Sequence, residues 1–499
     1  MKELTHFING AQVKGTSGDF GDVYNPATGE VQAKLPLATP AEVSKAVEDA
    51  AEAQVAWGNT NPQKRARVMM KMVALMNRDM DVLAEALSRE HGKTIPDAKG
   101  DLQRGLEVIE YCIGAPQMLK GEYTDDAGPG IDMYSMRQPL GVVASIMPFN
   151  FPAMMPLWHV GPALACGNAV VLKPSERDPS VPLMLAELFV EAGLPKGVFQ
   201  VVNGTKEAVD TLLDHDIIQG VSFVGSTPIA QYIYSRATAN GKRAQCFGGA
   251  KNHLIVMPDA DMDQAADALI GASYGAAGER CMAISVAVPV GEETADRLIG
   301  ALVPRIEKLR VAPYTDGNDV DYGPVVTREA KERILGLIQS GVDQGAELVI
   351  DNRDFKLQGY EDGFFVGPHL FDRVTPDMDI YKQEIFGPVL STVRAGSYEE
   401  ALKLAMDHEY GNGTAIFTRD GDTARDFAHR VNIGMVGINV PIPVPLAYHT
   451  FGGWKKSMFG DLNQHGPDSF KFYTRTKTIT SRWPSGIKEG GEFNFKAMD

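Results

Sequence analysis

Apolar runs alternate with amphipathic stretches between residues 140 and 240, and this rhythm constrains the fold more than any other feature of the sequence. Strand-like runs cover residues 140–150, 168–176, 197–204 and 220–226, and helix-like stretches cover 181–195, 206–215 and 227–240. A β-α-β-α-β order predicts a parallel, doubly wound sheet of the α/β class. Ligands of such sheets bind at the carboxyl ends of the strands, so we expect a site there.

The same rhythm restarts after residue 250, which predicts a second α/β domain. A strand is expected at 253–257, a helix at 261–278 and another strand at 283–291, and upstream residues 40–120 are mostly helical. Residues 121–138 and 469–483 have an extended composition and no core of their own. Such ribbons beside compact domains are candidates for pairing with another subunit.

Charge and composition exclude several classes of protein. The 499 residues include 48 basic and 64 acidic side chains, and the formal charge of −16 argues against binding to nucleic acid or to an anionic membrane surface. No uninterrupted apolar run reaches the length that spans a bilayer. The 4 cysteines form no CxxC pair, so we expect no metal site, and so few cysteines indicate a reducing compartment. We predict a cytoplasmic protein.

Cys281 stands out because two charged residues precede it in GAAGERCMA (275–283). A guanidinium beside the sulfur favours the thiolate, which is the form that attacks carbonyl carbons. A turn between helix and strand could also direct a backbone N–H at the attacked carbonyl. A small structural thiol that follows an arginine explains the same residues. Cys112, Cys166 and Cys246 lie in apolar surroundings and are expected to be structural.

Two short motifs follow strands of the first predicted sheet. In FVGSTPIA (223–230), a glycine and a hydroxyl precede a helix, whose N-terminus can receive a phosphate, although the same residues also make a good helix cap. In KPSE (173–176), Lys173 and Glu176 end a strand, and an acidic residue there can accept ribose hydroxyls. A solvated ion pair explains Lys173 and Glu176 equally well. These motifs alone leave a dinucleotide site undecided.

Six motifs in a fixed order resemble the aldehyde dehydrogenase superfamily, and together they spread over most of the chain. They are PFNFP (148–152), KPSE (173–176), FVGST (223–227), GGAKN (248–252), GERC (278–281) and EIFGPV (384–389). The resemblance implies an aldehyde dehydrogenase-like α/β fold: a Rossmann-type NAD-binding domain from 1–120 and 139–250, a catalytic domain from 251–445, and a β-ribbon for oligomerisation from 121–138 and 469–483. It also implies NAD as the cofactor and a homo-oligomer, either a dimer or a tetramer.

The resemblance assigns roles to individual residues. Cys281 would be the nucleophile, and the Asn150 side chain and the Cys281 amide would form the oxyanion hole. The residues that would hold NAD are Phe149, Lys173, Glu176, Arg177, Ser226, Gly248, Glu384 and Phe386. His253 and His449 are possible proton carriers, but a structural role explains them more simply.

The chain departs from the hydrolytic members of the superfamily at Phe247. In those members a glutamate opens the motif E-L-G-G-K and activates water, whereas the aligned residues here are Phe247-Gly248-Gly249-Ala250-Lys251. Phenylalanine cannot accept a proton, and general-base catalysis is worth about 10²–10⁴-fold. A thiol needs less help than water does, so the missing acid predicts transfer of the acyl group to coenzyme A.

One branch of the superfamily shares this departure, the CoA-acylating dehydrogenases of methylmalonate semialdehyde. The matching stretches are GAKNH (249–253), GERCMA (278–283) and INVPIPVP (438–445). The resemblance implies that Arg104 and Arg280 hold the substrate carboxylate, which suits guanidinium geometry, although a solvated helix face also explains Arg104. The expected products are propionyl-CoA from methylmalonate semialdehyde and acetyl-CoA from malonate semialdehyde, with loss of CO₂.

Two alternatives stay open at this point. One is a hydrolytic aldehyde dehydrogenase that uses Glu279 as a relocated base and releases a free acid. The other is a protein of the same fold that binds or assembles without turnover.

Overall fold

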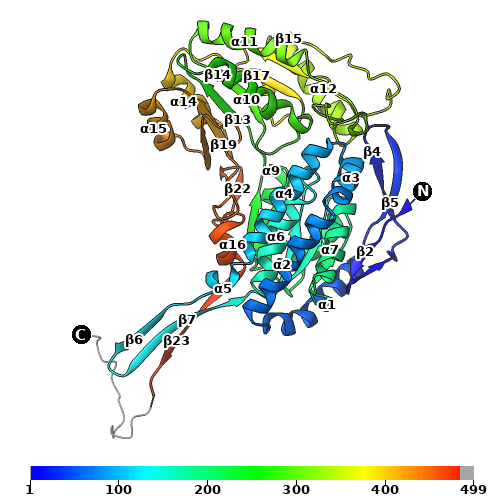
Figure 1. Ribbon diagram of the computed structural model, residues 1–499, viewed down its shortest axis with the longest axis vertical. Helices are drawn as coiled ribbons and strands as arrows, with labels where there is room; N and C mark the ends of the chain where they lie inside the picture. The colour runs from blue at the N-terminus through cyan, green and yellow to red at the C-terminus, as the bar shows by residue number, and fades with distance from the viewer. Residues whose placement is uncertain (1, 484–499) are drawn as a thin grey trace.

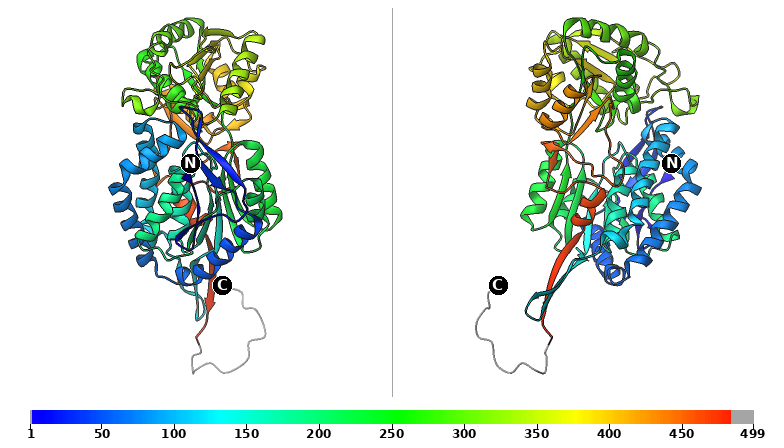
Figure 2. Two further views of the ribbon diagram at one scale, coloured as in Figure 1. Left: turned by 90° about the vertical axis from the view of Figure 1, so that its right-hand side faces the viewer. Right: turned by 60° about the vertical axis from the view of Figure 1, so that its left-hand side comes forward.

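The computed structural model describes residues 2–483, which form two α/β lobes and a projecting β-ribbon (Figure 1). We call the lobe built on residues 142–247 the first lobe and the lobe built on residues 252–438 the second lobe. Figure 2 shows the two lobes stacked along the long axis of the molecule, with the ribbon leaving the first lobe at the opposite end. Across residues 2–483, no helix is both long enough and apolar enough to cross a membrane.

The first lobe is built on an eight-stranded sheet with the strand order β22-β12-β11-β8-β9-β10-β2-β3. Its five central strands are parallel: β8 (Val142–Ile146), β9 (Ala169–Lys173), β10 (Phe199–Val201), β11 (Ile218–Val224) and β12 (Arg243–Phe247). Three short strands extend it antiparallel: β2 (His6–Ile8), β3 (Ala11–Val13) and β22 (Met458–Phe459). The chain turns to one side of β8 for β9 and β10 and to the other for β11 and β12, so the predicted doubly wound topology is confirmed.

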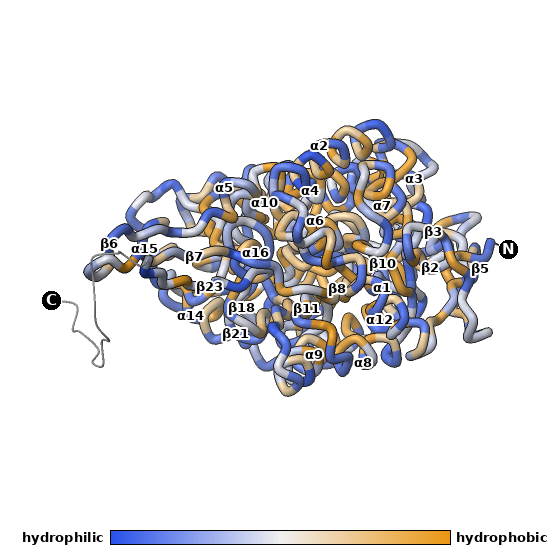
Figure 3. The backbone as a smooth tube through the Cα atoms, turned by 90° about the horizontal axis from the view of Figure 1, so that it is seen from below, coloured by the Kyte–Doolittle hydropathy of each residue, from blue (hydrophilic) through white to orange (hydrophobic). Residues whose placement is uncertain are grey.

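Helices cover both faces of this sheet. They are α1 (Pro40–Gly58), α2 (Pro62–Arg78), α3 (Met80–His91), α4 (Ile95–Cys112), α5 (Ala115–Met118), α6 (Met154–Ala165), α7 (Ser180–Glu191), α8 (Lys206–Asp214) and α9 (Thr227–Ala239). Every residue of α6 is buried, and Figure 3 shows apolar stretches gathered around it in the body of the lobe. Local signals set several helix starts: Thr39 and Glu42 form a capping box and Pro40 lies in the first turn of α1.

The second lobe is built on a seven-stranded sheet with the order β15-β16-β17-β14-β13-β19-β20. Its strands are β13 (Asn252–Val256), β14 (Ile284–Pro289), β15 (Glu347–Ile350), β16 (His369–Asp372), β17 (Val389–Thr392), β19 (Gly413–Phe417) and β20 (Met435–Ile438). Its helices are α10 (Met262–Tyr274), α11 (Glu292–Ile306), α12 (Arg328–Asp343), α13 (Asp379–Lys382), α14 (Tyr398–Asp407) and α15 (Gly421–Arg430). All neighbouring strands are parallel except β15, which pairs antiparallel with β16.

The helix expected at 261–278 is shorter than the sequence pattern indicated. The α-helix α10 ends at Tyr274, and residues Gly275–Gly278 form a 3₁₀ turn, η1. Ala276, Ala277 and Gly278 all have positive φ, at 50°, 54° and 74°. Right-handed helix cannot continue through such residues, because positive φ reverses the direction of the backbone turn.

The two extended segments pair with each other. The strands β6 (Tyr123–Gly128), β7 (Ile131–Pro139) and β23 (Thr474–Ser481) form an antiparallel sheet in the order β23-β7-β6, which projects from the first lobe (Figures 1 and 2). The expectation of a ribbon from residue 469 was wrong at its start, because α16 (Gly466–Phe472) occupies that stretch. Phe472 and Tyr473 are both buried, and consecutive burial ends the alternation that a half-buried strand requires.

The continuous run of first-core residues ends at Cys246 and that of the second core begins at Leu254, although Met282, Met435 and residues from 447 to 473 return to the first core. The complete domain limits given above stay a prediction. An N-terminal hairpin lies across both lobes: β4 (Phe20–Asn25) pairs with β5 (Glu30–Pro36), which also pairs with β1 (Lys2–Glu3). The Phe364 N–H in the second lobe donates to the Pro26 carbonyl at the turn of this hairpin, at 2.8 Å.

Candidate active site

Cys281 lies in the turn that joins η1 to β14, as the sequence suggested. Its backbone carbonyl accepts hydrogen bonds from two side-chain amides, Asn252 Nδ2 at 2.9 Å and Asn412 Nδ2 at 3.0 Å. These asparagines come from the start of β13 and from the loop before β19, so two strands of the second lobe hold the Cys281 backbone in place. The sequence analysis assigned no role to either residue, although Asn252 closes the quoted GGAKN motif.

Burial outweighs the effect of the arginine neighbour on the pKa of the Cys281 thiol. Burial raises the pKa of Cys281 to about 12, with a further rise from the nearby Glu384 carboxylate. The backbone amides of Cys281 and Met282 and the Arg280 guanidinium oppose this rise, and Arg280 contributes least among them. The guanidinium also pairs with Asp97 on α4, so it favours the thiolate, as expected, but less than burial opposes it.

Cys281 shares a small cavity with three other residues singled out in the sequence. A cavity of about 20 Å³ is lined by Cys281, Arg280, Glu384 and Phe386, together with Ala250, Asn252, Ser273, Gly278, residues 283–285, Ile385, Gly387 and Val389. Phe386 has a positive φ of 51°. A non-glycine residue in this region is uncommon and is typical of functional sites.

Glu384 is held from the loop that precedes β13. The Ala250 N–H donates to Glu384 Oε1 at 2.9 Å. The adjacent Lys251 is buried and donates to the carbonyls of Ile380 at 2.6 Å and Gln383 at 2.8 Å. Burial lowers the pKa of Lys251 to about 7, while Glu384 acts in the opposite direction. The turn that carries Glu384 is therefore fixed by both residues of the Ala250-Lys251 pair.

The glycines that precede this pair are required by close packing. A Cβ on Gly248 would lie 2.8 Å from both the Lys456 carbonyl oxygen and Thr227 Oγ1. A Cβ on Gly249 would lie 2.5 Å from Glu384 Oε2. These distances are shorter than real Cβ contacts, so the backbone of this loop approaches Glu384 only because the side chains are absent.

Three residues assigned to NAD by resemblance meet across the two lobes. The rings of Phe149 and Phe386 make an edge-to-face contact with centroids 5.9 Å apart. The Arg177 guanidinium lies 5.4 Å from the centroid of the Phe149 ring, and its Nη1 donates to Thr327 Oγ1 at 3.3 Å. Phe149 and Arg177 follow β8 and β9 of the first lobe, whereas Phe386 precedes β17 of the second lobe.

Lys173 and Glu176 form an ion pair of 3.0 Å at the carboxyl end of β9. Burial opposes ionisation of Glu176, but Lys173 and the neighbouring donors outweigh it and lower the pKa of this carboxyl. The glutamate is therefore an anion that can accept hydrogen bonds from hydroxyl groups. Lys173 is 7% exposed, so its ammonium group can contact only groups that lie at this edge of the sheet.

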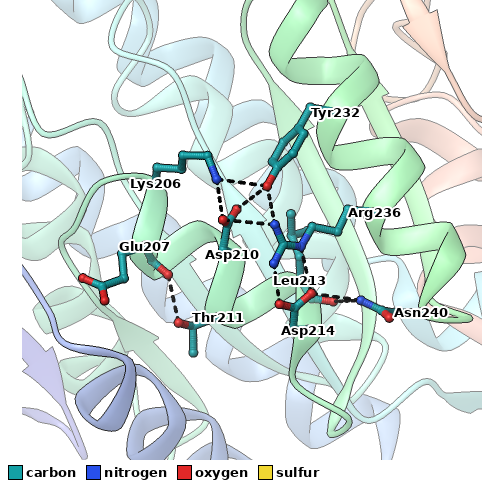
Figure 4. A network of polar contacts seen from close by, with 9 residues as sticks. All are labelled: Lys206, Glu207, Asp210, Thr211, Leu213, Asp214, Tyr232, Arg236 and Asn240. Atoms are coloured by element: carbon teal, nitrogen blue, oxygen red, sulfur yellow. Dashed lines mark hydrogen bonds and ion pairs between the residues drawn. The ribbon is translucent and has the colours of Figure 1, made fainter.

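Ser226 is the N-cap residue of α9, and in the described part of the chain its side chain makes no capping hydrogen bond. The helix is braced against α8 by a polar network, which Figure 4 shows. In it, Arg236 pairs with Asp214 at 2.5 Å and with Asp210 at 3.0 Å, and Tyr232 Oη donates to Asp210 at 2.7 Å. The network fixes α9 against α8. Because β9 and β11 are parallel to β8, the start of α9 lies at the same edge of the sheet as Lys173.

Asn150 lies in the loop between β8 and α6 and is buried, with its backbone carbonyl accepting from Lys93 Nζ at 2.6 Å. Arg104 lies on α4, where it pairs with Glu107 at 2.8 Å and donates to the Val444 carbonyl at 3.0 Å. Within residues 2–483, Arg104 and Arg280 have different partners. Each arginine has its own carboxylate partner on α4, so the shared role in binding a substrate carboxylate stays a prediction.

Phe247 ends β12 and is buried, and it supplies no proton acceptor. Glu279 is the carboxyl nearest to Cys281 in the sequence, but it is not among the residues that line the cavity beside Cys281. Its Oε1 accepts from the Val326 N–H at 3.3 Å, and within the described residues its buried Oε2 has no hydrogen-bond partner. Burial raises the pKa of Glu279 to about 8.

The histidines considered as proton carriers lie outside this cavity. His253 is buried, with Nδ1 against the Lys251 carbonyl at 2.8 Å and Nε2 against Tyr381 Oη at 2.9 Å. Burial lowers the pKa of His253 to about 3, so it stays neutral near pH 7. His449 contributes its carbonyl oxygen to His465 Nδ1 at 2.7 Å.

Comparison with known proteins gives consistent relatives over the whole chain. The sequence is 56% identical over 499 residues to the malonate-semialdehyde dehydrogenase of Pseudomonas aeruginosa, covering 100% of both chains. It is 49% identical over 480 residues to the mitochondrial methylmalonate-semialdehyde dehydrogenase [acylating] of Arabidopsis thaliana, covering 96% of this chain and 79% of that one.

Solved structures match in the same way. A protein from Sinorhizobium meliloti, provisionally named methylmalonate-semialdehyde dehydrogenase and crystallised with NAD, has 70% identity and a TM-score of 0.97, covering 98% of this chain and 99% of that one. The methylmalonate-semialdehyde dehydrogenase of Oceanimonas doudoroffii has 54% identity and a TM-score of 0.96, covering 97% and 99%. The expected fold class is thereby confirmed.

The sequence model of the Aldehyde dehydrogenase family matches residues 13–479. That range includes all six motifs and most of both lobes and of the ribbon. The chain therefore belongs to the aldehyde dehydrogenase family.

Proposed function

We propose that this protein oxidises malonate semialdehyde and methylmalonate semialdehyde with NAD and transfers the resulting acyl group to coenzyme A. The observation that carries the CoA-acylating reaction is Phe247, which stands where the hydrolytic members carry a catalytic glutamate. The names of the relatives support the substrate class, and the NAD complex of the similar Sinorhizobium meliloti structure supports the cofactor.

The first step belongs to Cys281. Its sulfur adds to the aldehyde carbon, and the carbonyl electrons move onto the oxygen. The Cys281 backbone N–H and the Asn150 side-chain amide donate to this oxyanion, and one such donor is typically worth about 10²–10³ in rate. When bound, NAD accepts the hydride that leaves the aldehyde carbon. The acyl group then remains on Cys281 as a thioester.

The residues that would hold NAD are distributed over both lobes. Lys173, Glu176 and Ser226 would bind the adenosine half and the pyrophosphate, while Glu384 and Phe386 would position the nicotinamide ribose and ring. Phe149, Arg177 and Gly248 complete the set. The ionised Glu176 is suited to ribose hydroxyls and disfavours a 2′-phosphate.

The thioester leads to loss of CO₂ from a 3-oxo acid. The carboxylate lies beta to the thioester carbonyl, so the electrons of the breaking C–C bond move into that carbonyl and form an enolate. Protonation gives the propionyl or acetyl thioester. The CoA thiolate then attacks the carbonyl, and the Cys281 thiolate leaves. Arg104 and Arg280 would hold the substrate carboxylate before it is lost.

Product analysis with and without CoA tests the proposal. With NAD, CoA and methylmalonate semialdehyde, we expect one CO₂ and one propionyl-CoA for each NADH, and acetyl-CoA from malonate semialdehyde. Without CoA, we expect a burst of one NADH per site followed by slow turnover. Free acid at the full rate without CoA would instead establish the hydrolytic alternative with Glu279 as base. Absence of NADH with either semialdehyde would leave a protein without turnover.

The quaternary structure is part of the proposal. We infer that the β-ribbon of β6, β7 and β23 pairs subunits, because its outer strands each have one edge unpaired within residues 2–483. A dimer or a tetramer is expected, and sedimentation of the purified protein decides between them. The excess of acidic residues gives no support to nucleic-acid binding.

A further inference from the structure

A buried ion pair lies behind the loop that carries Asn150. Lys93, just after α3, and Asp101, on α4, have their charged atoms 3.4 Å apart, with 1% and 0% of their side chains exposed. Taking two charges out of water costs free energy that their mutual attraction barely repays. The ion pair therefore adds little to the free energy of folding, and the reason for burying these two charges must come from their other contacts.

Lys93 and Asp101 make their shortest hydrogen bonds to the loop of residues 147–153, which carries Asn150, and to the first residue of α6. Lys93 Nζ donates to the Asn150 carbonyl at 2.6 Å, and the ammonium group lies 4.5 Å from the centroid of the Phe151 ring. Asp101 Oδ1 accepts from the Met154 N–H at 2.6 Å. Both hydrogen bonds, at 2.6 Å, are shorter than the 3.4 Å contact between the two charged groups.

Asp101 also supplies a cap that α6 lacks. The N-cap residue of α6 is Ala153, which has no side-chain oxygen, so the first N–H groups of the helix need an acceptor from elsewhere. The Asp101 carboxylate provides it from α4, and its negative charge suits the N-terminal end of a helix dipole. At the other end of the loop, the Met147 N–H donates to the Lys173 carbonyl at 3.0 Å.

From these contacts we infer that Lys93 and Asp101 are positioning residues for the oxyanion hole. They fix the backbone of Asn150 between two anchored ends, so that its side-chain amide is aimed before the substrate arrives. The inference rests on the proposed role of Asn150. An oxyanion donor acts over a narrow range of distance, and misplacement by about 1 Å can cost about 10²-fold in rate.

A double-mutant cycle in the full-length protein separates this role from general structural damage. The measured quantity is the rate constant of the NADH burst with methylmalonate semialdehyde in the absence of CoA. We expect Asn150→Ala to slow the burst by about 10²–10³-fold. Lys93→Met should slow it by about 10–10²-fold, with the dissociation constant of NAD changed by less than about twofold.

The combined variant Lys93→Met/Asn150→Ala should be no slower than Asn150→Ala by more than about twofold, because two residues that act through one interaction are not additive. Slowing equal to the product of the two single effects would overturn the inference. A burst at the wild-type rate in folded Lys93→Met would also overturn it. An unchanged burst in Asn150→Ala would instead remove the proposed role of Asn150, and no burst in the wild type would remove the proposed function.

Two further variants keep the test decisive if Lys93→Met does not fold. The neutral pair Lys93→Met/Asp101→Asn removes both charges but keeps an oxygen for the Met154 N–H, and the same cycle with Asn150→Ala applies to it. The control is Lys242→Met. Lys242 is also buried and donates to the carbonyls of His215 and Ile218, at 2.8 and 3.1 Å, but it precedes β12 at the amino end of the sheet. Its burst rate should stay within about twofold of the wild type; a loss equal to that of Lys93→Met would overturn the inference.

Discussion

In the first lobe, the residues assigned to the cofactor follow regular strands directly, whereas in the second lobe the reactive sulfur follows a backbone that is left-handed at three consecutive residues. Lys173 ends β9 and Ser226 follows β11 by two residues. Cys281, by contrast, comes after Ala276, Ala277 and Gly278, and Phe386 has a positive φ as well. The comparison shows that the residues proposed to bind the cofactor follow regular strands of one sheet, while the proposed nucleophile follows residues of positive φ beside the other.

The largest effect is expected at the sulfur itself. Cys281→Ala should abolish NADH formation, because within the described residues no other thiol lines the cavity, while NAD still binds through the first lobe. A coupled assay and titration of NAD binding measure the two properties. The matched control is Cys246→Ala, a buried cysteine of β12, which should keep its activity. NADH formation by Cys281→Ala would contradict the assignment of the nucleophile.

The next effect tests whether one substrate bridges both lobes. Arg104→Leu, on α4 of the first lobe, should raise KM for methylmalonate semialdehyde by about 10–10²-fold, because loss of a charged hydrogen bond costs about 1.5–3 kcal/mol. The KM for propanal, which has no carboxylate, should change by less than about threefold. Equal increases for both aldehydes would remove the carboxylate role of Arg104.

The strained turn before Cys281 can be tested through its backbone. Ala277→Val should lower both activity and the free energy of unfolding, the latter by about 1–3 kcal/mol, because a β-branched side chain resists positive φ. Ala277→Gly should be neutral or stabilising. In the regular strand β8, Ala144→Gly should instead destabilise by about 0.5–1 kcal/mol. Thermal unfolding of the three variants checks the contrast, which fails if both glycine variants behave alike.

The raised pKa of Glu279 predicts that the stability of the second lobe depends on pH. Its pKa is about 8 in the folded protein, against an ordinary value of 4.5. Between these values the unfolded chain has lost the proton that the folded protein keeps, so the free energy of unfolding falls as pH rises. Glu279→Gln should therefore gain roughly 1–3 kcal/mol at pH 8 relative to the wild type, and little at pH 4.5. Denaturant unfolding at both pH values measures this, and identical pH profiles would contradict it.

The smallest effect is expected at the regular edge of the first lobe. Ser226→Ala should leave thermal stability within about 0.5 kcal/mol, because the hydroxyl makes no capping bond in the described part of the chain. The KM for NAD should rise by about two- to fivefold if the hydroxyl meets the pyrophosphate. A loss of stability without a change in KM would assign Ser226 to the helix alone.

Much of the fold could be predicted because its signals are local. The strands β8, β9, β10 and β11 and the helices α7, α8 and α9 follow from hydrophobic periodicity, and Pro228 marks the first turn of α9. Helix α6 was not predicted, because it is buried on every side and shows no amphipathic pattern. The start of the ribbon was misjudged because residues 469–472 alternate in sequence but lie in α16, which packs against the first lobe. Only tertiary contacts decide between these outcomes.

The site was less predictable because its supports are far apart in the sequence. Asn252 and Asn412 bind the same Cys281 carbonyl from residues 29 and 131 positions away. Lys93 reaches Asn150 across 57 positions, and neither residue carries a local signal for this contact. The positive φ of Ala276 and Ala277 was also hidden, because alanine has no preference for that conformation. Resemblance supplied the candidate residues, but not the contacts that orient them.

The N-terminal hairpin makes the two lobes inseparable by genetic means. Residues 2–36 add strands to the first-lobe sheet and then reach the second lobe, where Tyr24 packs against Phe364 with ring centroids 6.1 Å apart. A fragment that begins at residue 250 would therefore lack the hairpin that covers Phe364. When the two halves are co-expressed, the second should fold only with the half that carries residues 2–36. A circular permutant should keep residues 2–36 joined to α1.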